Sequence, residues 1–220
     1  MSYVVITKKI WDSKNYTKLN KNIKVFNDIN LRNIMRINPK IIFFIHWSNY
    51  IPNFIYEKYL CIQFHASNLP KGKGGSPVQN QILNNISKSK ISAFRISKKL
   101  DSGPICMKEN FSLLGNAEQI FKEMEKKSIN MIGKLIKKKK IIFKKQIGKS
   151  SYFKRRKPFQ SKINLNKIKT LKKLYDFIRM LDAPGYPNAY IELKDFRFTF
   201  NHVRKKKNLL ETNVIIKNEK

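Results

Sequence analysis

The sequence predicts an α/β protein with a doubly wound, mostly parallel sheet, followed by a small C-terminal α+β element. Short apolar runs rich in β-branched and aromatic residues recur in the first half of the chain, and helix-compatible segments separate them. Strands that alternate with helices are typical of a parallel sheet covered on both faces. Past residue 148 a basic stretch gives way to one amphipathic segment and then to alternating apolar and polar residues.

The expected strands are almost continuously apolar, as in strands that are buried on both faces. They lie at residues 3–7, 23–27, 40–45, 60–65 and 90–97. Helices are expected between them, because those segments carry helical spacing and end at breakers such as Pro39. These helices lie around residues 13–20, 30–38, 53–59, 77–87 and 116–136.

The chain is expected to divide into three parts. Residues 1–148 would form a catalytic domain, residues 149–168 an exposed basic connector, and residues 169–220 a small C-terminal domain. The last part opens with an amphipathic helix over 169–181 and continues into a small β-element.

Composition limits the partners. The 47 Lys and Arg against 14 Asp and Glu give a net charge of +33, but only 8 of the basic residues are Arg and the Lys are spread along the chain. Nucleic-acid recognition favours Arg forks, so a solvated lysine surface is the preferred interpretation. A non-catalytic nucleic-acid-binding protein remains an alternative, supported by charge alone, and an anionic substrate is compatible with the charge.

Two further features limit the class of protein to which the chain can belong. Cys61 and Cys106 lie far apart in apolar segments, so both are expected to be reduced core residues. No apolar run approaches the roughly 18 residues of a membrane span, and the N-terminus lacks the apolar core of a signal peptide. A cytoplasmic protein with no membrane partner is therefore expected, and a homodimer is compatible with the sequence.

Two polar residues stand where such folds carry out chemistry. His65 ends the fourth expected strand and opens a loop rich in Gly, Pro, Ser and Lys, and ligands of open parallel sheets bind beyond the carboxyl ends of strands. Asp101 lies in the tight-turn sequence "DSGP". A histidine shuttles protons near neutral pH and a carboxylate can orient it. Alone, either residue is more often structural.

Three short motifs in order resemble one family. They are "HASNLP" at 65–70, "GGSP" at 74–77 and "DSGPI" at 101–105, and Asp101 follows His65 by 36 positions. This set resembles the N10-formyltetrahydrofolate-dependent formyltransferases. The resemblance extends over about residues 40–205, since "SYFKRRKP" and "YDFIRMLDAPGYPNAYI" are similar to the connector and C-terminal domain of the tRNA- and sugar-formylating branches.

The resemblance implies N10-formyltetrahydrofolate as co-substrate, no metal, and three catalytic residues. His65 would move the proton of the attacking amine, Asp101 would orient the imidazole, and Gln63 would stand where the family has an oxyanion-binding Asn. Gln63 is one methylene longer, so the donor could instead be Asn68 or a backbone N–H. The residues expected to line the folate site are Trp47, with an apolar stacking surface, and Ser67, Leu69, Pro70, Gly74, Gly75, Pro77, Gly103 and Pro104.

The formyl acceptor is expected to be a small primary amine. Residues 7–16 contain no Gly, so a dinucleotide cofactor is not expected. About 60 residues follow the connector, which is short for gripping a tRNA, so an amino sugar on a nucleotide carrier is the preferred acceptor. Methionyl-tRNA is the alternative acceptor, and hydrolysis of formyltetrahydrofolate is the alternative reaction.

Overall fold

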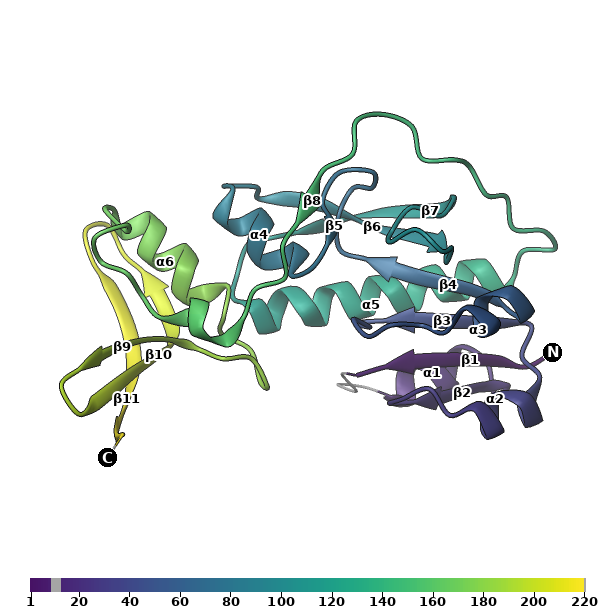
Figure 1. The fold of residues 1–220 in the computed structure, drawn as a ribbon, viewed down its shortest axis with the longest axis horizontal. Helices are drawn as coiled ribbons and strands as arrows, with labels where there is room; N and C mark the ends of the chain where they lie inside the picture. Colours follow the sequence, from purple (N-terminus) through teal and green to yellow (C-terminus); the bar gives the residue numbers. More distant parts are fainter. Residues whose placement is uncertain (9–12, 220) are drawn as a thin grey trace.

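The computed structural model describes residues 1–8 and 13–219 and shows two units joined by a long connector (Figure 1). The N-terminal unit has a six-stranded sheet with helices on both faces, and the C-terminal unit has a three-stranded antiparallel sheet and one helix. The glycine-free segment at residues 7–16 falls partly on residues 9–12, which lie outside the described residues. No helix of the described residues is long and apolar enough to cross a membrane.

The large sheet has the strand order β2-β1-β3-β4-β6-β7. The pairs β1–β2, β1–β3 and β3–β4 are parallel, whereas β4–β6 and β6–β7 are antiparallel. The expected mostly parallel, doubly wound sheet is thereby confirmed. Its strands are β1 (Tyr3–Thr7), β2 (Ile23–Phe26), β3 (Ile41–Ile45), β4 (Leu60–His65), β6 (Lys88–Arg95) and β7 (Ile105–Ser112).

Two hydrophobic cores cover the two faces of this sheet. Along β3, alternate residues point to opposite faces, so Phe43 joins the core under α1 and α5, and Phe44 joins the core under α2 and α3. These separate cores are what the continuous apolar runs of the strands require. The helices of this unit are α1 (Ser13–Leu19), α2 (Leu31–Ile37), α3 (Asn53–Lys58), α4 (Pro77–Leu83) and α5 (Ala117–Ile136).

Helix α5 starts at a capping box. The Asn116 side chain accepts a hydrogen bond from the Gln119 N–H, and the Gln119 side chain accepts one from the Asn116 N–H. The sequence shows a polar gap at 125–128 in its apolar stripe, yet Glu125 and Ser128 are buried. Glu125 is accommodated because it accepts a hydrogen bond of 3.0 Å from the Tyr16 hydroxyl of α1.

Strand β7 was not expected from the sequence. It is one of the two edge strands of the sheet, and polar residues such as Lys108, Glu109 and Asn110 interrupt its apolar positions. An edge strand with one solvated side needs no continuous apolar run, so the pattern that marks the central strands is missing.

The connector is mostly exposed at residues 149–160 and is also attached to the N-terminal unit. Its short strand β8 (Tyr152–Phe153) pairs in parallel with β5 (Lys73–Gly74), in the loop that follows β4. The Lys73 and Gly75 N–H groups donate to Ser151 and Phe153 carbonyls at 2.9 and 3.0 Å. Figure 1 shows the connector arching from the end of α5 and crossing back at β8 toward α6.

The C-terminal unit packs on the end of α5. It consists of η1 (Pro158–Ser161), α6 (Leu171–Arg179), β9 (Ala189–Leu193), β10 (Phe196–Lys205) and β11 (Leu210–Asn218), with the strand order β11-β10-β9. The buried Arg179 pairs with Asp176 at 2.7 Å and donates to the Leu113 and Gly115 carbonyls at 2.7 Å each. Charge-assisted bonds therefore fix the C-terminal unit against the loop before α5.

Candidate active site

A cavity of about 700 Å³ opens at the carboxyl ends of β1, β3 and β4. Lys8 follows β1, residues 45–51 end and follow β3, and Gln63, Phe64 and His65 end β4. The sheet order reverses between β1 and β3, and such switch points are where open α/β sheets bind ligands. The volume suits a small-molecule ligand of a few hundred daltons.

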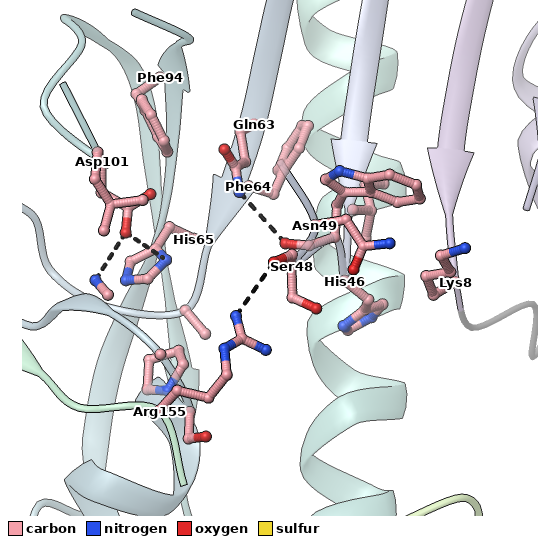
Figure 2. Close-up of a pocket in the computed structure, with 18 of the residues that line it drawn as sticks. Lys8, His46, Ser48, Asn49, Gln63, Phe64, His65, Phe94, Asp101 and Arg155 are labelled. Atoms are coloured by element: carbon pink, nitrogen blue, oxygen red, sulfur yellow. Dashed lines mark hydrogen bonds and ion pairs between the residues drawn. The ribbon is translucent and has the colours of Figure 1, made fainter. Parts of the chain in front are cut away.

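His65 and Asp101 are brought together at this cavity, as expected. Both are buried, and His65 Nδ1 lies 3.7 Å from Asp101 Oδ2 (Figure 2). His65 Nε2 lies 2.8 Å from the Gly72 carbonyl oxygen, which can only accept, so Nε2 carries the hydrogen. Nδ1 is therefore the basic nitrogen of the neutral ring. A proton accepted there would face the Asp101 carboxylate.

Asp101 is held in a turn that needs its particular sequence. Its φ of 45° is left-handed, a region that Asp tolerates better than most residues. Oδ2 accepts a hydrogen bond of 2.8 Å from the Gly74 N–H, and Gln146 Nε2 donates to the Asp101 and Gly103 carbonyls. A Cβ on Gly103 would lie 1.7 Å from the Arg95 carbonyl oxygen, so only glycine fits there.

The loop after His65 is anchored by buried side chains. Ser92 Oγ donates to the Ser67 carbonyl at 2.7 Å, and Gln81 Nε2 donates to the Ala66 carbonyl at 2.7 Å. Ser67 Oγ in turn donates to the Lys71 carbonyl at 2.8 Å, which closes the loop on itself. The loop therefore presents Gly72 and Gly74 to the His65–Asp101 pair in a fixed geometry.

Gln63 faces the cavity on the same side of β4 as His65. Its Nε2 donates to the Trp47 carbonyl at 3.4 Å (Figure 2). This is a long hydrogen bond, which an incoming oxyanion can replace at little cost. The amide is thus available as a donor beside His65.

Trp47 lies in the wall beside Gln63 but is nearly enclosed. It is 6% exposed, its ring centroid lies 5.9 Å from that of Phe44, and the Lys8 ammonium lies 5.0 Å from the centre of its ring. Trp47 is both a core residue and a cavity-lining residue, and its stacking role stays a prediction.

The connector and the C-terminal unit complete the cavity. Arg155 Nη2 donates to the Ser48 carbonyl at 3.3 Å across the opening (Figure 2). Tyr186, in the loop between α6 and β9, lines the cavity against Phe121 of α5, with ring centroids 5.6 Å apart. Burial raises the pKa of Tyr186, against the opposing effect of Arg155, so its hydroxyl stays protonated near neutral pH.

A solved structure similar to the whole chain decides the family. A methionyl-tRNA formyltransferase from Clostridium thermocellum is 38% identical, superposes with a TM-score of 0.93, and the match covers 99% of each chain. The chain belongs to the N10-formyltetrahydrofolate-dependent formyltransferase family. A family model described as the methionyl-tRNA formyltransferase C-terminal domain also matches residues 158–217.

Two further relatives are similar to parts of this chain or to its fold. A methionyl-tRNA formyltransferase from Thermodesulfovibrio yellowstonii is 29% identical over 181 residues, which are 79% of this chain and 58% of that protein. The chain thus spans little more than half the length of that curated relative. A 4-N formyltransferase from Francisella tularensis shares the fold, with a TM-score of 0.71 and 18% identity over 86% of this chain and 91% of that one.

The residues expected to line the folate site divide into two groups. Trp47, Gly74, Gly75 and Pro77 line the cavity together with the three expected catalytic residues. The others lie behind it and shape the loops. Ser67 lines a neighbouring cavity, Leu69 and Pro70 form a cis peptide within the loop, and Gly103 and Pro104 lie in the Asp101 turn.

Several lining residues were not expected from the sequence. They are Lys8, Phe121, Met124, Arg155 and Tyr186. Arg155 and Tyr186 come from segments remote in sequence, and Phe121 and Met124 look like ordinary core positions of a helix. His46 also lines the cavity, and the sequence does signal this position, because His46 directly follows the carboxyl end of a strand.

The two cysteines lie outside the cavity lining. Burial raises the pKa of the Cys61 thiol to about 12 and that of Cys106 to about 11. Because the thiolate is the reactive form, both are inert near neutral pH. Both are free, as expected.

Proposed function

We propose that this protein transfers the formyl group of N10-formyltetrahydrofolate to the amino group of methionine esterified to tRNA. The observation that carries the proposal is the buried His65–Asp101 pair, 3.7 Å apart, beside the Gln63 amide in a cavity at the sheet's switch point. That arrangement offers a proton carrier, a charge partner and an oxyanion donor to one reacting centre.

The chemistry proceeds by addition and elimination. The amine nitrogen attacks the formyl carbon, the C=O bond opens to an oxyanion, and the Gln63 N–H donates to that oxygen. His65 Nδ1 accepts the proton of the attacking nitrogen, and Asp101 stabilises the resulting imidazolium. Collapse of the intermediate breaks the bond between carbon and N10, and the imidazolium returns its proton to N10. The products are the formylated amine and tetrahydrofolate.

The acceptor differs from the amino sugar preferred on sequence grounds. That preference rested on the small size of the C-terminal unit, but a family model named for methionyl-tRNA formyltransferase matches this very unit, over residues 158–217. The same range holds thirteen Lys and Arg against five Asp and Glu. An excess of basic residues of this kind favours a polyanion over a single diphosphate. Both findings support the tRNA alternative better than the sugar.

The test is a competition between acceptors. Formyltetrahydrofolate is supplied with methionyl initiator tRNA and with a panel of nucleotide-linked amino sugars, at matched and near-physiological salt. Formylation of methionyl-tRNA, with turnover reduced as salt rises, is the expected result. Formylation of a sugar alone would overturn the acceptor and leave the transferase reaction intact.

Two further outcomes would overturn the reaction itself. Release of formate at the same rate with and without an acceptor would show a hydrolase. Tight tRNA binding with no turnover and no folate binding in calorimetry would show a non-catalytic nucleic-acid-binding protein.

A further inference from the structure

Lys73 is a buried lysine that the proposed reaction does not use. It lies in β5, in the loop that follows His65, and is only 4% exposed. It lines neither the active-site cavity nor the neighbouring cavity, and it forms no ion pair within the described part of the chain. Lysine is almost never buried without a charged partner, because it is unfavourable to remove an ammonium group from water. The contacts of this ammonium must therefore offset its burial.

A hydroxyl group and an aromatic ring hold the ammonium. Lys73 Nζ donates a hydrogen bond of 2.9 Å to Ser102 Oγ, which donates in turn to the Leu100 carbonyl at 2.8 Å. The same ammonium lies 5.8 Å from the centre of the Tyr152 ring, on the connector strand β8. A cation within about 6 Å of an aromatic ring is attracted to its face. The ammonium is thus fixed at Ser102, the residue directly after Asp101.

Three consecutive residues of this loop hold the His65–Asp101 pair. The Gly72 carbonyl accepts a hydrogen bond from His65 Nε2 at 2.8 Å, and the Gly74 N–H donates to Asp101 Oδ2 at 2.8 Å. Lys73 lies between the two glycines and is the only one of the three that has a side chain. The main chain of the loop therefore fixes the imidazole and the carboxylate, and the Lys73 side chain fixes the turn that carries the carboxylate.

The Asp101 turn needs this support. Asp101 has a φ of 45°, and a non-glycine residue in the left-handed region is held there only by its surroundings. Its Oδ2 lies 3.7 Å from His65 Nδ1 (Figure 2), so a small rotation of the turn would separate the two groups. A displacement of about 1 Å at a reacting group can lower a rate by about a hundredfold.

We propose that Lys73 is a positioning residue for the formyl transfer, because its ammonium locks the Asp101 turn through Ser102 and keeps the carboxylate facing His65 Nδ1. This assignment rests on the proposed function, in which Asp101 stabilises the imidazolium. The ammonium also places a positive charge beside the turn that bears the Asp101 carboxylate. Lys73 lies outside the cavity lining, so it acts on the reaction only through Asp101.

The experiment separates positioning from general support of the fold. Lys73→Met removes the charge and the donor at nearly constant length, and Lys73→Arg keeps both. Lys71→Met is the matched control, because Lys71 is an exposed lysine of the same loop and its contact with Ser67 uses the main chain. Each protein is assayed for kcat with saturating methionyl-tRNA and formyltetrahydrofolate, for the Kd of reduced folate by calorimetry, and for stability by urea denaturation.

Lys73→Met should lower kcat at least about tenfold, with the Kd for folate within about twofold, and Lys73→Arg should recover most of the loss. The urea midpoint of Lys73→Met should not fall, because an apolar side chain in place of a buried charge is often neutral or stabilising. Combined with Asp101→Asn, Lys73→Met should lower kcat by no more than about a further twofold, because no carboxylate is left to position. Lys71→Met should keep kcat within about twofold of wild type.

The outcomes separate this proposal from the proposed function. A Lys73→Met enzyme within about twofold of an active wild type would overturn the positioning role and leave the formyltransferase reaction standing. Multiplicative losses in the Asp101→Asn background would also overturn it, since Lys73 would then act independently of Asp101. A lower urea midpoint, with a loss of kcat that Lys73→Arg does not recover, would show a purely structural role.

Two further results are decisive in special cases. If Lys73→Met fails to fold, Ser102→Ala, which removes only the hydroxyl acceptor, decides by the same measurements of kcat with and without Asp101→Asn. A wild type that binds reduced folate but formylates no acceptor would overturn the proposed function, and the positioning role would fall with it.

Discussion

The loop from residue 66 to 76 and the connector segment 151–155 border the same cavity, but different interactions hold them. The loop is fixed to the sheet by buried side chains, with Ser92 and Gln81 each donating a hydrogen bond of 2.7 Å to its carbonyls. The connector is fixed to the loop by main-chain pairing between β5 and β8. It also packs so closely that a Cβ on Gly75 would lie 2.5 Å from Arg155 Cα.

Because of this difference, substitutions in the two segments are expected to have different effects on the reaction. The loop carries the Gly72 carbonyl and the Gly74 N–H that hold His65 and Asp101, so it belongs to the reaction centre. The connector pairs with the loop and also lines the cavity itself through Phe153 and Arg155, but it makes no hydrogen bond to the His65 or Asp101 side chain among those given for the described residues. A change that removes the loop's hydrogen bonds to His65 or Asp101 should therefore disturb the chemistry, whereas a change at the contact between Gly75 and Arg155 should shift the connector and leave the His65–Asp101 pair in place.

The largest effect is expected at the pair that the loop holds. His65→Asn, Asp101→Asn and the double variant should each lower kcat by at least about a hundredfold. The losses should be similar rather than multiplicative, because residues that act as a unit give non-additive effects. Single-turnover kinetics and folate calorimetry would be measured together, with folate binding largely kept. A His65→Asn enzyme within a few fold of wild type would assign the proton transfer to another residue.

Gln63 comes next, because we propose its amide as the oxyanion donor and not as a proton carrier. Gln63→Leu removes the donor at nearly constant size and should lower kcat by about tenfold to a hundredfold. Gln63→Asn restores an amide on the stem length typical of the family and is the matched control, expected to keep most of the activity. Equal rates for all three proteins would remove Gln63 from the oxyanion site and point to Asn68 or a backbone N–H.

The difference between the loop and the connector also explains which features of the fold and site could be predicted from the sequence. His65 and Asp101 were found because their motifs are local, and the central strands were found because burial on both faces leaves a continuous apolar run. Arg155 was missed because its place depends on a two-residue strand pairing, which leaves no period in the sequence.

The other features that were not predicted from the sequence also depend on contacts between distant parts of the chain. Strand β7 lacks an apolar run because it lies at the sheet edge. Phe121 and Met124 show the ordinary spacing of a core-facing helix, and only Tyr186, brought in from the C-terminal unit, places them at a cavity. Sequence patterns report what each element buries, and they do not report which elements meet.

A smaller effect is expected where the connector meets the loop. Gly75→Ala places a methyl group against Arg155, so the connector must shift while His65 and Asp101 stay in position. Displacement of the cavity wall should raise KM for tRNA and lower kcat/KM by about tenfold, with kcat at saturating tRNA nearly unchanged. Limited proteolysis should show faster cleavage in the connector. Lys154→Ala, on the exposed side of the same segment, is the control and should change neither constant. A fall in kcat alone in Gly75→Ala would contradict the separate roles of the loop and the connector.

The smallest effect is expected on the free energy of unfolding when the Cys61 thiol of β4 is removed. The same thiol also reports whether β4 stays closed to solvent in the native state. Burial raises the pKa of Cys61 to about 12, whereas an unfolded thiol ionises near about 8.5. Between these values the native state binds more protons than the unfolded state, so this group makes the free energy of unfolding fall as pH rises.

Cys61→Ala should therefore show a shallower decline of the free energy of unfolding between pH 9 and 11, measured by urea denaturation, with turnover at neutral pH changed by about twofold at most. Lys and Tyr titrations are common to both proteins and cancel in the difference. Native protein should also resist iodoacetamide at pH 8, with both thiols labelled only after unfolding. Rapid labelling of Cys61 in the native state would mean that β4 opens, and the anchored loop would then be no more rigid than the connector that depends on it.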